Sequence, residues 1–193
     1  KNLLYLLQAI EEKTNMRYRL GSLNPLEIGD EMINFLKKSN KFCPHFHLSL
    51  QSMCDKTLKA MNRHYSAEFS LDLIEQISKS FKNPFLGSDI IAGFAGETEE
   101  DFQITVENLK KSKLTKIHTF PYSMRKNTKA ALSPLQVDEK VKTERASIIK
   151  QISAQKYNEF LQRNLGTIQE VLIEKHLDKH TEYLKGKTKN YIN

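Results

Sequence analysis

The sequence predicts an α/β fold: a run of parallel strands that forms part of a (β/α) barrel, followed by an incomplete small β module. Strand-like apolar segments alternate with amphipathic helical segments of about ten or more residues, the pattern of βαβ units and a parallel sheet. Right-handed crossovers would curl such units into a barrel or part of one. After Gly166 the pattern changes to short alternating segments rich in lysine. We therefore expect two domains, residues 1–165 and 166–193.

The elements of the first half are set by apolar periodicity and by residues that end or cap helices. Leu3, Leu4, Leu7 and Ile10 share one face of a helix over residues 1–14. A strand is expected at Tyr18–Leu23, and Asp30 reads as the N-cap of a helix. The remaining expected elements are a strand at Phe46–Leu50 and helices at Lys56–Met61 and Ala67–Phe81.

The second half continues the alternation and then ends in a long helix. A buried strand at Phe85–Phe94, a helix at Glu99–Lys111 and a strand at Thr115–Phe120 come first, and residues 124–136 read as a loop. Asp138 caps a helix that runs through Arg163, with Gly166 as the residue that ends it. Its expected inward spine is Val141, Ile148, Ile152 and Phe160, and the short strands expected beyond it are Thr167–Glu174, Glu182–Leu184 and Asn190–Ile192.

Composition narrows the class of partner and compartment. The formal charge of +7 and the pI near 9.3 favour a polyanion such as RNA, although a merely lysine-rich surface fits the charge equally well. Cys43 and Cys54 are too few and too far apart for a disulfide framework or a cluster-binding run. Of the six histidines, those at 45, 47, 64 and 118 lack metal-like spacing, and we predict no metal ligand in this chain. We find no signal peptide and no membrane span, and expect a cytoplasmic protein.

Polar or glycine-rich residues follow four of the expected strands, where parallel α/β folds bind ligands. Ser22–Asn24, Gln51–Ser52, Gly93–Glu97 and Pro121–Ser123 would therefore converge at one edge. Each of them alone fits an ordinary strand end or helix start. The absence of a GK[ST] sequence after Gly93–Gly96 argues against a phosphate-binding loop.

Three motifs resemble those of radical S-adenosylmethionine (SAM) methylthiotransferases. They are residues 47–52 (HLSLQS) followed by 54–63 (CDKTLKAMNR), residues 89–102 (DIIAGFAGETEEDF), and residues 118–131 (HTFPYSMRKNTKAA), in the family's order over roughly residues 17–175. Residues 43–47 and 120–123 are most similar to the MtaB type. Met53 and Asn127 stand where the family usually has Gly, and Ala95 where it has Pro.

The resemblance implies a partial radical-SAM-type barrel that holds SAM against a [4Fe–4S] cluster. By analogy Gln51, Ser52 and Arg63 hold the ribose and methionine end, while Ile91, Gly93 and the backbone of Phe120–Tyr122 frame the adenine. The cluster cysteines of the family are absent here and are expected upstream. Reductive cleavage of SAM, with electrons from an external donor, would start the chemistry. Because the cluster cysteines are absent, residues 1–193 alone should be catalytically inactive.

The resemblance also implies tRNA as the macromolecular partner. The MtaB type adds a methylthio group to C2 of N6-threonylcarbamoyladenosine at position 37 of tRNA, and the alternative MiaB type acts on isopentenyladenosine. The last residues resemble the start of a TRAM domain, an RNA-binding barrel, and the lysines expected to contact RNA are Lys175, Lys179, Lys185, Lys187 and Lys189. A second hypothesis is a non-catalytic RNA-binding module.

Overall fold

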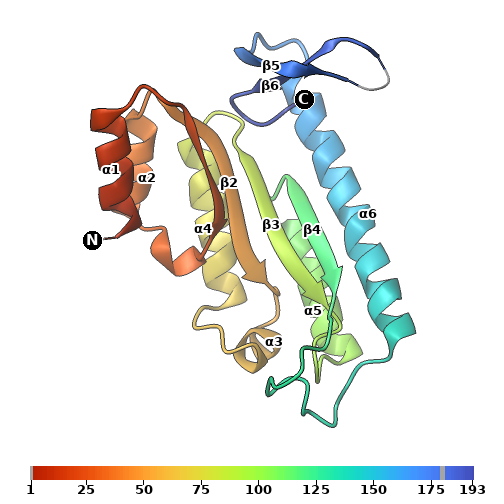
Figure 1. Cartoon of the computed structure of the whole chain (residues 1–193). Helices are drawn as coiled ribbons and strands as arrows, with labels where there is room; N and C mark the ends of the chain where they lie inside the picture. Colours follow the sequence, from red (N-terminus) through yellow and green to blue (C-terminus); the bar gives the residue numbers. More distant parts are fainter. Residues whose placement is uncertain (1, 179–180) are drawn as a thin grey trace.

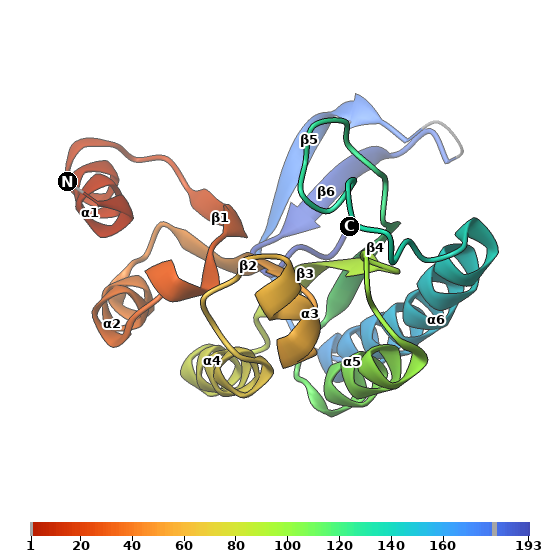
Figure 2. The same cartoon turned by 90° about the horizontal axis from the view of Figure 1, so that it is seen from below.

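The structure is a computed structural model that describes residues 2–178 and 181–193 (Figure 1). A four-stranded parallel sheet in the order β1-β2-β3-β4 has its helices on one face (Figure 2), and a two-stranded antiparallel sheet, β5-β6, follows. The predicted α/β class, with parallel strands and then a small β module, is confirmed. The elements are α1 (Leu3–Lys13), β1 (Tyr18–Leu23), the 3-10 turn η1 (Pro25–Glu27), α2 (Asp30–Lys38), β2 (Phe42–Gln51), α3 (Asp55–Ala60), α4 (Ala67–Ser80), β3 (Phe85–Ala92), α5 (Glu99–Lys111), β4 (Lys116–Pro121), α6 (Glu139–Asn164), β5 (Val171–Leu177) and β6 (Leu184–Thr188).

The two faces of the parallel sheet differ in chemistry because successive side chains of a strand point to opposite sides. In β2, Phe46, Leu48 and Leu50 are fully buried beneath the helices, whereas His45 and His47, which alternate with them, are only half-buried. The buried face forms one apolar core with side chains of α1, α2, α4, α5 and α6. Burying each large apolar side chain in such a core contributes about 1.5–3 kcal/mol. The opposite face of the sheet is more polar, although Ile91 and Phe120 also lie on it.

The parallel pairing places the carboxyl ends of the strands at one edge of the sheet. Ile91 of β3 lies beside Phe120 of β4, and Gln51 at the end of β2 lies beside Ile90. These ends point downward in Figure 1, away from the β5-β6 hairpin at the other end of the sheet. The register therefore brings together three of the polar strand ends that the sequence predicts to converge.

Helix α6 packs beside β4 and α5, but its buried face is not the apolar stripe that the sequence suggests. Ile152 and Phe160 are buried as expected, whereas Ile148 is 39% exposed on the outer side. Lys142, Arg145 and Lys156 are buried instead, each with partners described below. Apolar periodicity cannot reveal cationic side chains that are buried because their charges are paired or hydrogen-bonded.

Several predicted boundaries need correction. Asp30 is the first residue of α2 and Gly29 is its N-cap, which has no side-chain cap bond. Strand β3 stops at Ala92 because Gly93 turns into left-handed backbone at φ +73°. Residues 190–192 form a turn rather than a strand, since Tyr191 has φ +73° and its N–H donates to the Thr188 carbonyl at 3.1 Å. Within the described part of the chain, no helix has the length and apolarity needed to cross a membrane.

Candidate functional site

A cavity of about 450 Å³ opens at the carboxyl ends of β2, β3 and β4. Gln51, Ile91, Phe120 and Tyr122 from the predicted set line it, together with Asp89, Pro121, Ser123 and Arg125. Its volume falls within the range of about 300–1,000 Å³ that is usual for small-molecule sites. The wall combines an apolar side chain, two aromatic rings, an amide, a carboxylate and a guanidinium. This mixture suits an amphipathic ligand with a flat ring and polar ends.

The apolar part of this wall comes from the last residues of two neighbouring strands, β3 and β4. Phe120 is 53% exposed although its ring is large and apolar, and it pairs in register with Ile91. A half-exposed ring next to a branched aliphatic side chain offers a surface on which a flat ligand can stack. Gln51 adds the amide, and its left-handed backbone at φ +65° ends β2 at the edge of the cavity.

Ser52 and Arg63 are not among the residues that line this cavity. Ser52 is completely buried, and its hydroxyl accepts from the Cys54 N–H at 3.2 Å and lies 3.4 Å from the Thr105 hydroxyl. The contact with Thr105 fastens the loop after β2 to α5. Arg63 is half-buried just beyond α3, and its backbone N–H donates to the Leu58 carbonyl. For both residues, contact with a ligand stays a prediction.

Gly93 is required by packing against α6 as well as by its positive φ. A side chain added there would overlap Lys142 Cγ, and its Cβ would lie 3.2 Å from Lys142 Cβ. The Gly93 N–H donates to Glu97 Oε2 at 2.7 Å. This donor is therefore already used, so a ligand that meets Gly93 would have to use its carbonyl. Its predicted part in framing the adenine is untested.

Glu97 is a buried carboxylate with a perturbed pKa, and the sequence does not reveal its environment. It follows the glycine turn and looks like a solvated helix start, yet only 1% of its side chain is exposed. Burial raises the pKa of this carboxyl, against the opposing effect of the Gly93 N–H and of Arg145, whose Nη1 lies 2.8 Å from Glu97 Oε2. Nothing in the local sequence marks the pair, because its partners are 48 residues apart.

Asp89 also belongs to a cluster of polar side chains, with His47 and His118, on the open face of the sheet. Asp89 Oδ1 is 3.1 Å from His47 Nε2, within ion-pair distance but without the alignment of a hydrogen bond. The His47 and His118 rings meet edge to face with centroids 5.3 Å apart. Burial, followed by nearby positive charge, lowers the pKa of His118, which favours its neutral form. Both rings thus pack against each other on this face, and His47 also lies within ion-pair distance of Asp89.

The described residues contain no group of three or more histidine, cysteine or acidic side chains placed to hold a metal. Cys43 and Cys54 are both buried and free. A [4Fe–4S] cluster therefore has no ligand set in this part of the chain, and the placement of its ligands elsewhere stays a prediction.

Met53 and Asn127 fit their positions without strain. Met53 is completely buried and is not one of the residues with positive φ, so no glycine-like backbone is needed there. Asn127 does adopt left-handed backbone, at φ +66°, which asparagine tolerates better than most residues.

Most of the predicted RNA-binding lysines lie on or near the β5-β6 hairpin. Lys175 and Lys185 are exposed, and Lys185 Nζ lies 3.2 Å from Asp178 Oδ2. Lys187 lies over the Tyr191 ring at 4.2 Å, and Lys189 pairs with Glu170 at 2.8 Å. Lys179 lies outside the described residues. Among the described lysines of this set, Lys185, Lys187 and Lys189 already have partners within the chain.

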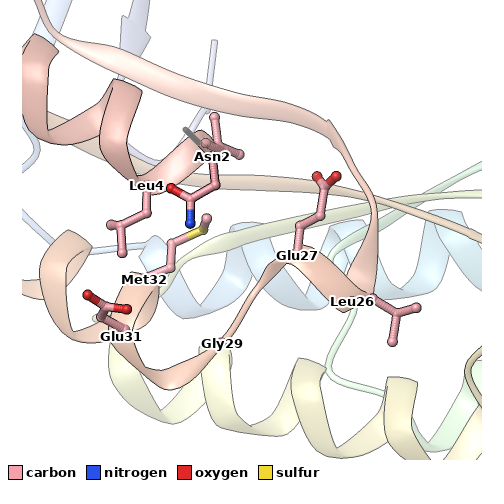
Figure 3. Close-up of a pocket in the computed structure, with 8 residues that line it drawn as sticks. Asn2, Leu4, Leu26, Glu27, Gly29, Glu31 and Met32 are labelled. Atoms are coloured by element: carbon pink, nitrogen blue, oxygen red, sulfur yellow. The ribbon is translucent and has the colours of Figure 1, made fainter.

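A second hollow lies away from the strand ends described above, between the starts of α1 and α2 and the turn η1 (Figure 3). Leu4 and Met32 contribute apolar side chains, and Glu27 and Glu31 contribute carboxylates at its rim. It contains none of the residues predicted to bind a ligand.

Comparison with known proteins relates the site to a family. The model of the radical SAM superfamily matches residues 2–109, which include the first two strand ends of the cavity. Over 175 residues, which are 91% of its length, the chain is 38% identical to the tRNA-2-methylthio-N(6)-dimethylallyladenosine synthase of Finegoldia magna. It is 37% and 36% identical to the threonylcarbamoyladenosine tRNA methylthiotransferases MtaB of Rickettsia prowazekii and Bacillus subtilis, each over 91% of the chain.

The likeness covers only part of those proteins. The chain spans 38% of the Finegoldia protein, 42% of the Rickettsia protein and 40% of the Bacillus protein. A solved structure of archaeal Methanocaldococcus infernus Elp3 superposes with a TM-score of 0.48 at 12% identity, covering 86% of this chain and 37% of that one, a likeness too weak to support a conclusion. The family model, by contrast, matches more than half of the chain, and the chain belongs to the radical SAM superfamily.

Proposed function

We propose that the protein containing this chain is a radical SAM methylthiotransferase that acts on tRNA. The observation that carries the proposal is the cavity at three strand ends, whose wall includes Gln51, Ile91, Phe120 and Tyr122. Relatives named for this reaction on two tRNA nucleosides support the class of activity. As the finer proposal we choose C2 of N6-threonylcarbamoyladenosine as the target, with the dimethylallyl (isopentenyl) adenosine as the alternative.

The residues of the cavity fit SAM, a ligand with a purine ring, a ribose and a cationic amino-acid end. Phe120 and Ile91 present apolar surface for the purine, and Gln51 offers an amide for hydroxyl groups. Asp89 is the acidic member of the lining and complements a cationic ligand. Bound beside a reduced [4Fe–4S] cluster, SAM supplies the radical that removes a hydrogen atom from the substrate. The residues of this chain would hold and orient the ligand and exclude water from it.

The reaction is tested by giving the full-length, cluster-reconstituted protein two tRNA substrates, one with each modified adenosine. We expect a methylthio group on N6-threonylcarbamoyladenosine when digests are measured by mass spectrometry. Product from the isopentenyladenosine substrate alone would select the alternative target. No methylthiolated nucleoside from either tRNA would contradict the proposal.

The cavity is tested by replacing Phe120 with alanine in the same protein. Loss of a stacking surface costs about 1–3 kcal/mol, so we expect roughly tenfold weaker binding of S-adenosylhomocysteine by calorimetry. Leu132→Ala is the matched control, since Leu132 is an apolar loop residue that is 81% exposed and does not line the cavity. Equal affinity in Phe120→Ala and the control would place the cofactor elsewhere.

The second candidate is an RNA-binding module without chemistry, favoured by the exposed lysines of the hairpin. Removing residues 166–193 is a poor test because the segment also packs on the barrel residues: Asn190 donates to the Asn83 carbonyl at 3.1 Å. Lys175→Ser and Lys185→Ser are better. Each should flatten the salt dependence of tRNA binding by roughly one unit of slope. Binding of tRNA that persists in a full-length protein with no SAM binding and no product would favour this candidate.

A further inference from the structure

Helix α6 is joined to the turn after β3 by a buried arginine. Arg145 Nη1 lies 2.8 Å from Glu97 Oε2 and 3.1 Å from the Glu97 carbonyl oxygen, and Nη2 lies 3.0 Å from Glu99 Oε2. Only 6% of the Arg145 side chain is exposed. Its planar guanidinium thus serves acceptors on two residues at once, which a lysine ammonium cannot reproduce with the same geometry.

The same carboxylate continues the connection to the end of β3. Glu97 Oε2 also accepts the Gly93 N–H at 2.7 Å, so one oxygen links the helix to the residue directly after the strand. Ile91, whose side chain lines the cavity, lies two residues before Gly93. A shift of the turn would therefore move the strand end that forms part of the cavity wall.

One helical turn earlier, α6 also reaches the end of β4. Lys142 packs against Gly93, and its ammonium lies 5.4 Å from the centre of the Tyr122 ring. Tyr122 lines the cavity, and its N–H donates to the Ala92 carbonyl at 2.8 Å. Helix α6 thus holds the ends of β3 and β4 together from behind the cavity, although neither Arg145 nor Lys142 lines it.

We infer that Arg145 is a positioning residue for the SAM site: through Glu97 it fixes the turn after β3 and, with it, the cavity wall formed by Ile91 and Tyr122. This inference rests on the proposed function, because it assigns the cavity to SAM. It makes SAM binding depend on Arg145, a residue that does not line the cavity and lies outside residues 2–109, the part matched by the family model. The role is to set geometry, and Arg145 makes no contact with the ligand.

The experiment uses the full-length protein with Arg145→Met, Arg145→Lys and the control Arg163→Met, in which an exposed arginine of the same helix is replaced. Amide hydrogen exchange reports on residues 92–98, and calorimetry gives the affinity for S-adenosylhomocysteine. In Arg145→Met we expect faster exchange and about tenfold weaker binding, the loss of roughly one charged hydrogen bond. Arg145→Lys should recover part of both, and Arg163→Met should match the wild type.

Steady-state kinetics separate positioning from general destabilisation. Arg145→Met should raise KM for SAM by about the same factor as it weakens binding, with kcat at saturating SAM nearly unchanged. Affinity equal to the wild type despite faster exchange would overturn the inference and leave Arg145 a purely structural residue. If Arg145→Met does not fold, Arg145→Lys decides, and unchanged affinity in that variant overturns the inference too. A wild-type protein that fails to bind S-adenosylhomocysteine would instead contradict the proposed function.

Discussion

Gly93 is held by two independent constraints, a left-handed backbone at φ +73° and contact with the Lys142 side chain. Gly93→Ala should therefore lower the free energy of unfolding by about 1–3 kcal/mol through backbone strain, with a further loss from the overlap. Gly166→Ala is the matched control, because Gly166 has nearly the same φ of +72° but nothing within 4 Å of an added Cβ. Urea denaturation measures both variants. Equal losses in the two would show that crowding by Lys142 contributes nothing.

His45 makes the stability of the fold depend on pH. Burial lowers the pKa of this imidazole to about 4, and its ring stacks on Phe85 with centroids 5.0 Å apart. A folded-state pKa below the unfolded value of about 6.5 means that the unfolded chain binds the proton more readily. Stability from this group is thus complete above pH ~6.5 and is lost as pH falls toward ~4.

His45→Gln should remove that part of the pH dependence. Chemical denaturation of wild type and variant across this window measures the difference between them. We expect the stabilities of the two proteins to converge as the pH falls, because only the wild type has an imidazole at this position. In its unfolded state that imidazole takes up a proton, which lowers the stability of the wild type. A difference that stays constant from pH 7 to pH 4 would contradict the assignment to His45.

Helix α6 stabilises the fold at both ends of α5, and the contact at the far end is a buried lysine. Lys156 Nζ donates to the carbonyl oxygens of Ser112 at 2.7 Å and Lys110 at 3.2 Å, where α5 ends. A cation at a helix C-terminus is favoured by the helix dipole. Lys156→Met would leave those carbonyls without this partner, so we expect a loss of about 1–3 kcal/mol in the free energy of unfolding.

The matched control is Lys150→Met, which replaces an exposed lysine of the same helix. It should change stability by less than about 0.5 kcal/mol, since it removes no buried contact. Thermal and urea unfolding of both variants provide the comparison. A Lys156→Met protein as stable as Lys150→Met would show that the α5 carbonyls are satisfied in another way.

Elements were predictable where their signals are local. The bounds of α5 match the prediction because Thr98 and Asp101 form a capping box at its start and lysines end it. The inner face of α6 was not predictable, because Arg145 and Lys156 are buried only by virtue of partners on distant segments. The same holds for the cavity. The residues at the strand ends were predictable from their position, but the contacts of Glu97 with Gly93 and Arg145 were not.

At the scale of the whole molecule, the terminal hairpin is tied to the sheet at the end opposite the cavity. Asn190 donates to the Asn83 carbonyl and to Asn164 Oδ1, and the Tyr191 ring packs on His45 with centroids 4.4 Å apart. A two-stranded sheet is marginally stable by itself, so these contacts stabilise the hairpin as well as the barrel residues. The division at residue 165 therefore marks a change of sequence pattern across which these contacts run.

Exposed apolar surface gathers on this hairpin more than on the open face of the parallel sheet, which carries His45, His47, Asp89 and Lys116. The exposed hairpin residues are Val171, Leu172, Ile173, Leu177 and Leu184, all at least 45% exposed. Exposed apolar surface of this kind promotes association. We therefore expect residues 1–193, as an isolated chain, to self-associate at about micromolar concentration through the hairpin.

Leu172→Thr with Leu184→Thr tests that expectation, because threonine keeps the strand propensity and removes apolar area. Sedimentation velocity should show oligomers in the wild-type chain and a larger monomer fraction in the double variant. Leu132→Thr, which changes a loop leucine that is 81% exposed, serves as the control and should behave as the wild type. A monomeric wild-type chain would contradict the prediction outright. Oligomers that persist in the double variant would move the contact to the open face of the sheet, where His47→Ser and Lys116→Ser would then be the informative substitutions.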